Sequence, residues 1–425
     1  MGHNNEFMRA ASHRPALRIL APLAACVLLL TACTSPVGNP SIEVTTEDRV
    51  FAPVKIRMTG MEPGAEVTLR SEASIGDFGF AASAVFVAGT DGVVDLSEAE
   101  PVSGDWAVAD PMAPFWASTG GIANQPSLWD EPYDVRLTIL DGAGDALAET
   151  TVHRPGLAPG VHSKSVTDDG IVGVYAVPAD LNAGEQRPAV LVFGGSEGGG
   201  EFAAATARWI AGLGYPALGI SYFGSEGQPP RLEEVPAETF LAALAWLHEQ
   251  DEVDDARVFT HGTSRGGEMA LWLAATHPTE VFGAFAPVGA GAVVCGAPNA
   301  ALPAWTLAGK PLVDDCFGPP ETMVPPDAVI DVAAIGGPVV LACGTADQLW
   351  PSCEFAADIV DRRGRDQETG LARGKGADHY VSLPPYTPWP GLTEDPATLA
   401  ATHVVRVEFW RIVRDTLADA SSPGG

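Results

Sequence analysis

The run R-V-F-T-H-G-T-S-R-G-G-E-M-A-L-W-L-A-A-T occupies residues 257–276 and contains the pattern Gly-x-Ser-x-Gly, with Ser264 at its centre. A short apolar stretch precedes the pattern, and apolar residues at helical spacing follow it directly. This order predicts a strand, a sharp turn and a helix, which together form a nucleophile elbow that projects the serine hydroxyl above a sheet. With 47 glycines among 425 residues the pattern also arises by chance, so the rest of the chain must support it.

Residues 161–420 alternate between short apolar runs and amphipathic segments. Continuous apolar runs are typical of strands that are buried on both faces. The alternation therefore predicts an α/β domain, a mostly parallel sheet with helices on both faces and ligands bound at the carboxyl ends of the strands. We expect strands at 172–177, 189–193, 217–221, 258–261, 282–288 and 339–343, and helices at 201–213, 237–250 and 398–417 besides the one after Ser264.

Two further residues follow the serine in the order that an α/β-hydrolase requires, first an acid and then a histidine. Asp347 lies on the loop after the strand at 339–343, and His379 lies on a glycine-flanked loop before the last helix. A serine hydroxyl is a weak nucleophile and needs a histidine base that a carboxylate holds in place. We therefore predict the triad Ser264, His379 and Asp347. Asp378 is the rival acid, but neighbours in sequence rarely point the same way.

The loop G-G-S-E-G-G-G at residues 194–200 follows a predicted strand. An oxyanion that forms during acyl transfer needs backbone N–H donors. We expect one donor from Arg265, directly after the serine, and the other from Gly195 or Ser196. The rival interpretation is a phosphate-binding loop, but the Gly-Lys-Ser/Thr ending and the Gly-x-Gly-x-x-Gly spacing are absent. Glu268, on the helix after Ser264, is expected to anchor that helix rather than to react.

Residues 1–33 have the composition of an export signal. Three arginines precede an uncharged run that is too short to span a membrane comfortably and that ends in L-T-A-C at residues 30–33. This ending resembles the bacterial lipobox, in which the cysteine, here Cys33, carries the lipid. We predict a lipid-anchored protein of the cell envelope, with residues 34–40 as a tether. An ordinary secretory signal is the alternative, and either signal implies export.

Export also bears on the remaining cysteines. Once Cys33 carries lipid, the chain keeps Cys295, Cys316, Cys343 and Cys353. An even number of cysteines in an oxidising compartment suggests two disulfides, and proximity favours Cys295–Cys316 and Cys343–Cys353. No cluster has metal-ligand spacing, so we expect neither a metal nor another cofactor. The net charge of −30 argues against nucleic-acid binding, which depends on lysine and arginine.

Residues 41–154 alternate apolar and polar side chains with a period of two, interrupted by glycine, proline and aspartate. Several short strands at this spacing predict a small, immunoglobulin-like all-β sandwich, with residues 157–160 as the linker to the α/β domain. The run D-P-M-A-P-F-W at 110–116 is apolar and irregular. It is interpreted as a plug at the edge of the sandwich or, alternatively, as a lip over the neighbouring site.

Motifs in both parts of the chain resemble one family, the acyl-CoA thioesterases and bile-acid-CoA:amino-acid N-acyltransferases. They are M-E-P-G at 61–64, G-V-V-D-L-S at 92–97, D-P-M at 110–112, F-G-G-S at 193–196, I-S-Y-F at 220–223 and P-P-Y at 384–386. The resemblance implies a β-sandwich followed by an α/β-hydrolase domain, with Ser264, Asp347 and His379 as nucleophile, acid and base. The transferases carry cysteine as the nucleophile, so Ser264 favours hydrolysis.

The sequence therefore predicts an exported, lipid-anchored serine hydrolase that cleaves a small-molecule acyl ester or thioester. The proline-rich insertion at residues 289–337 is expected to cover the acyl pocket. Two alternatives stay open, namely acyl transfer to an unknown acceptor and a non-catalytic lipoprotein that binds an acyl compound. An exported chain of this charge would rarely meet acyl-CoA, so the leaving group is open as well.

Overall fold

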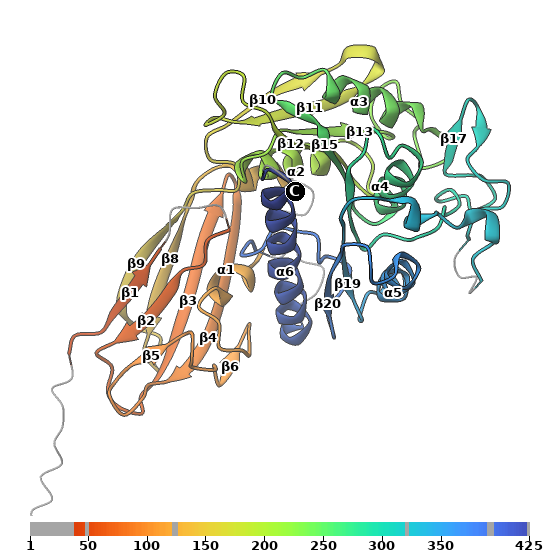
Figure 1. The fold of residues 1–425 in the computed structure, drawn as a ribbon. Helices are drawn as coiled ribbons and strands as arrows, with labels where there is room; N and C mark the ends of the chain where they lie inside the picture. Colours follow the sequence, from red (N-terminus) through yellow and green to blue (C-terminus); the bar gives the residue numbers. More distant parts are fainter. Residues whose placement is uncertain (1–37, 47–50, 121–125, 319–322, 389–394, 423–425) are drawn as a thin grey trace, which may run out of the picture. The chain divides into compact units, whose positions relative to one another are not determined.

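The computed structural model describes residues 38–46, 51–120, 126–318, 323–388 and 395–422. The signal, the lipobox with Cys33 and most of the tether lie outside these ranges. Within Val37–Gly425, which form one compact unit, an all-β part is followed by an α/β part (Figure 1). The predicted fold class is confirmed. In the described ranges, no helix combines the length and the apolar character that a membrane span requires.

The first part is a sandwich of two antiparallel sheets. One sheet has the order β1 (Ser41–Thr45), β2 (Lys55–Thr59) and β5 (Val94–Asp95). The other has the order β6 (Ser103–Gly104), β4 (Phe78–Val87), β3 (Glu66–Ile75), β8 (Tyr133–Leu140) and β9 (Ala146–Arg154), and β7 (Thr119–Gly120) pairs with β4. Alternate residues of these strands are buried, as at Val67 and Leu69 of β3, because successive side chains point to opposite faces.

The second part is built on an eight-stranded sheet. Its order is β10 (Val161–Val166), β11 (Val172–Pro178), β13 (Ala217–Ser221), β12 (Arg187–Phe193), β15 (Val253–Gly262), β16 (Gly283–Pro287), β19 (Val339–Gly344) and β20 (Thr369–Gly374). Strand β11 is antiparallel to both of its neighbours, β10 and β13. The six strands from β13 to β20 are parallel to one another. The parallel strands end at one edge of the sheet, which is where such folds bind ligands.

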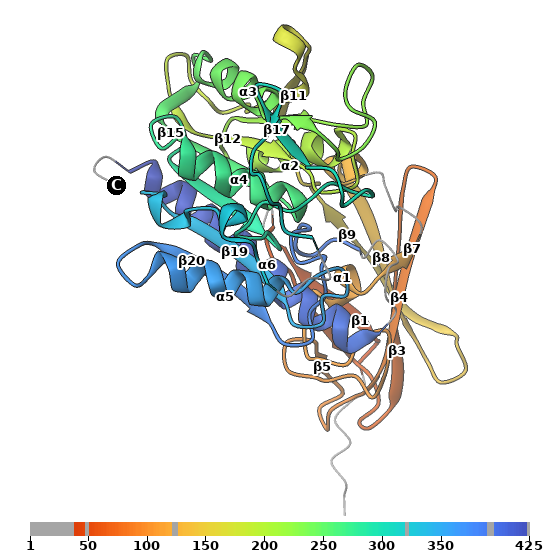
Figure 2. The same ribbon diagram turned by 90° about the vertical axis from the view of Figure 1, so that its right-hand side faces the viewer.

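Five long helices cover the two faces of this sheet (Figure 1 and Figure 2). Helices α2 (Glu201–Gly212) and α6 (Pro396–Ala420) pack on one face, in an apolar cluster that includes Val190 and Val192 of β12. Helices α3 (Glu238–His248), α4 (Arg265–Thr276) and α5 (Ser352–Arg363) pack on the other face, with Leu191 and Phe193. The period of two in β12 therefore divides its side chains between two cores.

The sandwich contacts the α/β part through α6 and α2. Leu399 and Ala400 of α6 lie in the core cluster of the sandwich. Trp116, in the short helix α1 (Ala113–Trp116), stacks on His403 of α6 with ring centroids 4.9 Å apart. The apolar run at 110–116 thus packs between the two parts, as a plug would.

Several elements were not predicted. The edge strands β10 and β20 and helix α5 lack a continuous apolar run, because each is covered on one side only. In β4 the alternation is weak, because alanine occupies buried positions (Ala82 and Ala84) as well as the exposed position Ala81. Hydrophobic periodicity detects burial, so elements that are only partly buried give a weak signal.

Candidate active site

Ser264 stands between β15 and α4 in a conformation that few residues adopt. Its φ is 55° and its ψ is −117°, in the region that disfavours residues with a side chain. The two neighbouring glycines make this turn possible. A Cβ atom on Gly262 would lie 2.1 Å from the carbonyl oxygen of Gly266, and one on Gly266 would lie 2.1 Å from the carbonyl oxygen of Gly194. The geometry is therefore that of a nucleophile elbow.

His379 and Asp347 meet at the same edge of the sheet. Asp347 Oδ2 lies 2.8 Å from His379 Nδ1, and Asp347 Oδ1 accepts hydrogen bonds from the backbone N–H groups of Leu349 and Trp350. Burial alone would raise the pKa of Asp347, but its interactions, led by the hydrogen bond and the charge of His379, lower the pKa below its usual value. An ionised Asp347 holds the imidazole with Nε2 turned away from the acid.

The rival acid Asp378 has other partners. Its carboxylate accepts hydrogen bonds from the hydroxyl of Thr402 and from the backbone N–H of Tyr380. These bonds fix the loop that carries His379 against α6. Asp347 is thus the carboxylate that the structure brings to the imidazole.

A cavity of about 400 Å³ opens beside Ser264. Ser264 and His379 both line it, together with the glycine-rich loop, helix α2 and the loop that follows His379. Within the described residues no hydrogen bond joins Ser264 Oγ to the imidazole. Such bonds are often long in enzymes without substrate, so the arrangement is consistent with a serine and a base that share one site.

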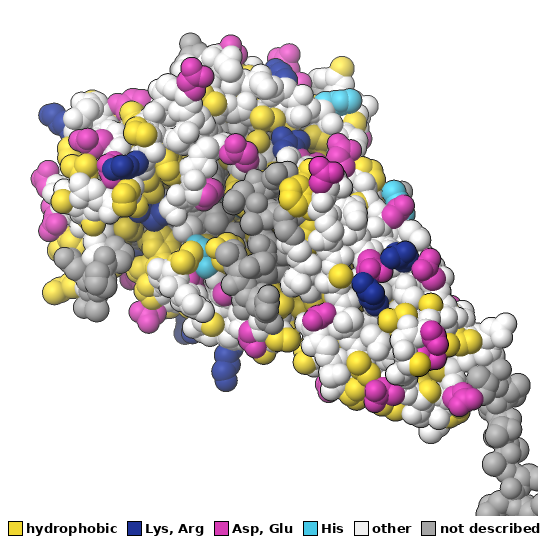
Figure 3. Space-filling model, turned by 180° about the vertical axis from the view of Figure 1, so that it is seen from behind, with side chains coloured by type: hydrophobic (Ala, Val, Ile, Leu, Met, Phe, Trp, Pro, Cys, Tyr) yellow, Lys and Arg dark blue, Asp and Glu magenta, His cyan; other side chains and the backbone are white. Residues whose placement is uncertain are grey.

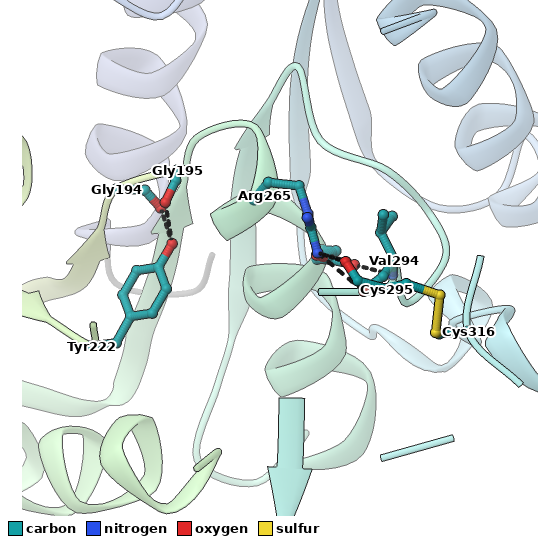
Figure 4. Close-up of polar contacts among 8 residues, drawn as sticks. Gly194, Gly195, Tyr222, Arg265, Val294, Cys295 and Cys316 are labelled. Atoms are coloured by element: carbon teal, nitrogen blue, oxygen red, sulfur yellow. Dashed lines mark hydrogen bonds and ion pairs between the residues drawn. A yellow bond between two sulfur atoms is a disulfide. The ribbon is translucent and has the colours of Figure 1, made fainter. Parts of the chain in front are cut away.

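The hydroxyl of Tyr222 holds the glycine-rich loop from below (Figure 4). It donates to the carbonyl oxygens of Gly194, at 3.1 Å, and of Gly195. In a trans peptide the C=O and N–H groups point in opposite directions. The two bonds therefore turn the N–H groups of Gly195 and Ser196 away from Tyr222. Tyr222 belongs to the motif I-S-Y-F at 220–223 and follows directly on a buried strand, but the sequence did not indicate this role for it.

The two candidate loop donors differ in their partners. The Gly195 N–H is donated to the carboxylate of Glu197, at 2.9 Å to Oε1 and 3.0 Å to Oε2. The Ser196 N–H makes no hydrogen bond within the described part of the chain. Desolvation by the surrounding protein raises the pKa of Glu197, although its backbone donors and His379 oppose the shift. Ser196 is thus the loop residue whose N–H is free to receive an oxyanion.

Arg265 links the elbow to the insertion at 289–337 (Figure 4). It is the first residue of α4, so the helix leaves its backbone N–H unpaired. Its guanidinium donates to Glu268 at 2.8 Å and to the carbonyl oxygens of Val294 at 3.0 Å and Cys295 at 2.8 Å. Glu268 also accepts the Val294 N–H, at 2.5 Å. Glu268 therefore anchors its helix, as expected.

The insertion at residues 289–337 does not lie where the sequence predicted, over the acyl pocket. None of its described residues lines the cavity, so it does not cover the acyl pocket. It folds instead over α4 and is bound by Arg265 and by the disulfide Cys295–Cys316. Backbone carbonyl groups of the insertion accept hydrogen bonds from the buried guanidinium of Arg265 instead of facing the cavity. A second disulfide joins Cys343 to Cys353, so the pairs are those that proximity favours.

Two other histidines of the α/β part have structural surroundings. His403 is buried against Trp116, and His261 is a buried residue of β15. No residue of the run 110–116 lines the cavity, so this run is not a lip over the site. In the described ranges, no group of three or more His, Cys, Asp or Glu side chains is placed to hold a metal ion.

Comparison with known proteins gives the same picture as the motifs. Residues 52–168 match the family model described as the acyl-CoA thioester hydrolase/BAAT N-terminal region. The mitochondrial acyl-coenzyme A thioesterase 2 of Rattus norvegicus is 27% identical over 364 residues, which cover 79% of this chain and 77% of that protein. The chain is a relative of the acyl-CoA thioesterases. The resemblance that the sequence motifs suggested is therefore confirmed.

The chain is similar to other proteins as well. Acyl-coenzyme A amino acid N-acyltransferase 1 of Mus musculus is 25% identical over 368 residues, which cover 80% of this chain and 85% of that protein. Residues 223–294 match the model of the prolyl oligopeptidase family. The solved structure of a putative dienelactone hydrolase from Klebsiella pneumoniae aligns with a TM-score of 0.42 and 19% identity, over 61% of this chain and 98% of that one.

The buried pair of Arg265 and Glu268 gives a test of the site's framework. The substitution Glu268→Ala leaves the guanidinium and the Val294 N–H without their carboxylate. Removing one partner of a buried ion pair costs about 3–5 kcal/mol, so we expect the free energy of unfolding to fall by that amount in urea denaturation. Asp361→Ala, at an exposed position of α5, is the control and should change it by less than about 0.5 kcal/mol. Equal losses in the two variants would contradict the anchoring role.

Proposed function

We propose that the protein is a serine hydrolase that cleaves an acyl ester or thioester through Ser264, His379 and Asp347. The observation that carries this proposal is the convergence of three features on one cavity. They are a serine on a strained elbow, an imidazole bonded to a buried carboxylate, and a glycine-rich loop in which the Ser196 N–H has no partner among the residues that the structure describes. The relatives named as acyl-CoA thioesterases support the hydrolase class and the acyl substrate.

In the proposed reaction Ser264 Oγ attacks the acyl carbon while His379 Nε2 takes the hydroxyl proton. Asp347 keeps the Nδ1–H of the imidazole and stabilises the imidazolium. The N–H groups of Ser196 and Arg265 stabilise the oxyanion of the tetrahedral intermediate. As this intermediate collapses, the alcohol or thiol leaves with the proton from His379. A water molecule then gives its proton to the same nitrogen and attacks the Ser264 ester. As the second tetrahedral intermediate collapses, His379 returns this proton to Ser264 Oγ and the carboxylic acid leaves.

Hydrolysis is favoured over transfer to an acceptor because the nucleophile is a serine. A serine ester is aminolysed less readily than the thioester that a cysteine would form. The acyl-CoA substrate of the relatives is a separate question, since this chain has a net charge of −30. On the face shown in Figure 3 acidic side chains are widely scattered, and the chain has 54 Asp and Glu residues against 24 Lys and Arg. A polyanionic leaving group would meet repulsion on approach, so we propose an ester or thioester with an uncharged leaving group.

The first prediction concerns the nucleophile. We expect Ser264→Ala to lower kcat/KM for p-nitrophenyl esters by at least about 10⁴-fold, because the acyl-enzyme can no longer form. The measurement is steady-state hydrolysis by residues 35–425, with labelling of Ser264 by a fluorophosphonate as a second readout. The exposed Ser165→Ala on β10 serves as control and should keep the wild-type rate. Turnover that survives Ser264→Ala, or a wild type without turnover or labelling, would overturn the proposed function.

A second prediction concerns Tyr222. The substitution Tyr222→Phe removes the hydroxyl that orients the N–H groups of the glycine-rich loop. Loss of an oxyanion donor costs roughly 10²–10³-fold, and loss of its orientation should cost less, so we expect kcat to fall about 10-fold with little change in KM. Affinity for a boronic acid, which imitates the tetrahedral intermediate, should fall in parallel.

The control for this prediction is Tyr175→Phe, which removes another buried hydroxyl. Tyr175 lies on β11 and donates to Glu252 at 3.3 Å, and it does not line the cavity. Its removal should leave kcat unchanged. A Tyr222→Phe variant that raises KM without lowering kcat would show that the hydroxyl acts on substrate binding and not on the oxyanion.

We further propose that the protein is exported and anchored to the cell envelope by lipid on Cys33. The sequence around Cys33, which resembles a lipobox, carries this proposal. Two disulfides in the α/β part support it, because disulfides persist mainly in oxidising compartments.

A test of this proposal uses the full-length chain in a bacterial host. We expect the wild type to fractionate with membranes and the Cys33→Ala variant to lose both the lipid and the membrane association, because no acylated residue would remain. Mass spectrometry of the N-terminus measures the lipid, and Cys26→Ala is the control, which should stay in the membrane fraction. Membrane association that persists in Cys33→Ala would contradict the anchor.

A further inference from the structure

We propose that Trp209 closes the inner end of the acyl pocket and that Asp130, a residue of the sandwich, holds Trp209 in place. The sandwich would thereby limit the length of the acyl chain that the α/β part accepts. This inference rests on the proposed function and extends it to a substrate class, uncharged acyl groups of limited length.

Helix α2 forms one wall of the cavity. Phe202, Ala203, Thr206 and Trp209 all line it. Their spacing places them along one side of the helix, since residues three and four apart lie above one another. From Phe202 to Trp209 the helix rises about 10 Å, at 1.5 Å per residue. The wall therefore extends away from the glycine-rich loop and Ser264 by about that distance.

The two ends of the cavity differ in exposure. Ser196, beside the nucleophile, is exposed, and Phe202 at the start of α2 is half-buried. Further along α2, Ala203 is 2% exposed, Thr206 8% and Trp209 1%. The cavity is thus open at Ser264 and closed at Trp209, and a chain attached to the Ser264 ester would run inward along α2.

The chemistry of the inner part suits an uncharged chain. Phe193, Phe202, Trp209 and Leu383 contribute apolar surface. Four titratable side chains line the cavity within the described residues. Glu197, His379 and Tyr380 lie in the loops around Ser264, and the fourth is His261 of β15. Burial lowers the pKa of His261 to about 4, so it is neutral near pH 7. A charged group at the inner end would find no partner of opposite charge.

Trp209 is fixed from the side of the sandwich. Its indole Nε1–H donates to Asp130 Oδ1 at 2.6 Å, and the other carboxylate oxygen accepts from Nε of Arg208. Asp130 ends the 3₁₀ helix η1 (Pro126–Asp130), and its side chain is buried. One carboxylate therefore binds two consecutive residues of α2, and a hydrogen bond to an ionised acceptor is about twice as strong as a neutral one.

The neighbour of Asp130 reinforces this contact. Trp129 lies in the same apolar cluster as Trp209 and packs on Phe80 of β4, with ring centroids 5.2 Å apart. The indole of Trp209 is thus bonded at its nitrogen and backed by the sandwich. A ring held in this way cannot turn aside for a longer chain, so each methylene beyond the limit should be rejected strongly.

The experiment measures kcat/KM for p-nitrophenyl esters from acetate to laurate. We expect the kcat/KM of the wild type to fall sharply once the acyl chain exceeds a limiting length. Trp209→Leu should move this fall to longer chains and raise the ratio of kcat/KM for long and short esters at least about 10-fold, since one methylene in an apolar pocket changes kcat/KM by about 10–200-fold. Asp130→Ala, which frees the ring, and Trp209→Phe, which makes it smaller, should raise the same ratio by a smaller factor than Trp209→Leu does.

Asp168→Ala is the matched control. Asp168 accepts a hydrogen bond from Trp246 Nε1 at 3.3 Å, outside the cavity, so its loss should leave the profile unchanged. Melting temperatures separate lost specificity from lost folding. If Trp209→Leu does not fold, Trp209→Phe and Asp130→Ala carry the comparison.

The results distinguish a failure of this inference from a failure of the proposed function. A wild type without Ser264-dependent turnover refutes the hydrolase itself. An active wild type whose profile is kept by all three variants at Trp209 and Asp130 refutes the pocket end alone. An equal change in Asp168→Ala would show a general effect on stability and would also overturn the inference.

Discussion

The strained backbone at Ser264 is the constraint on which the site depends. A side chain at positive φ persists only where its surroundings allow no other conformation. Gly262 and Gly266 leave no space for a Cβ atom, and the Gly266 contact is with the carbonyl group of Gly194. The elbow and the glycine-rich loop are therefore in backbone contact. Any movement of the nucleophile would move the loop that is proposed to stabilise the oxyanion.

Both sides of this contact are held by buried polar groups. Tyr222 binds the loop carbonyl groups, and Arg265 binds carbonyl groups of the insertion while Glu268 neutralises its charge. Buried polar groups are costly unless they are satisfied, so such a network has few alternative arrangements. The result is a pair of N–H groups, on Ser196 and Arg265, whose directions are fixed before any substrate arrives. Preorganised donors of this kind need no rearrangement when negative charge develops.

The sequence was sufficient for the local elements that carry the proposed triad, because these follow chain order. The strand, turn and helix around Ser264, and the loops that carry Asp347 and His379, are local patterns in a known sequence of elements. The contacts of Tyr222, Glu197 and Trp209 could not be predicted, because each depends on a partner from another part of the chain. The insertion was assigned wrongly for the same reason. Its composition says that it is irregular, but only the guanidinium of Arg265 decides what it covers.

The carboxylate of Glu197 gives the site an asymmetry. It binds the N–H of Gly195 and stands beside His379, so it adds negative charge close to the position of the oxyanion. Such a charge opposes the intermediate but favours the imidazolium that forms with it. Desolvation raises the pKa of Glu197 and so favours its neutral form, which reduces this opposition. The negative net charge of the chain would repel anionic leaving groups at longer range, and the apolar wall along α2 is proposed to accept the acyl part. The proposed selection against anionic leaving groups and the proposed selection for acyl length would therefore come from opposite ends of one cavity.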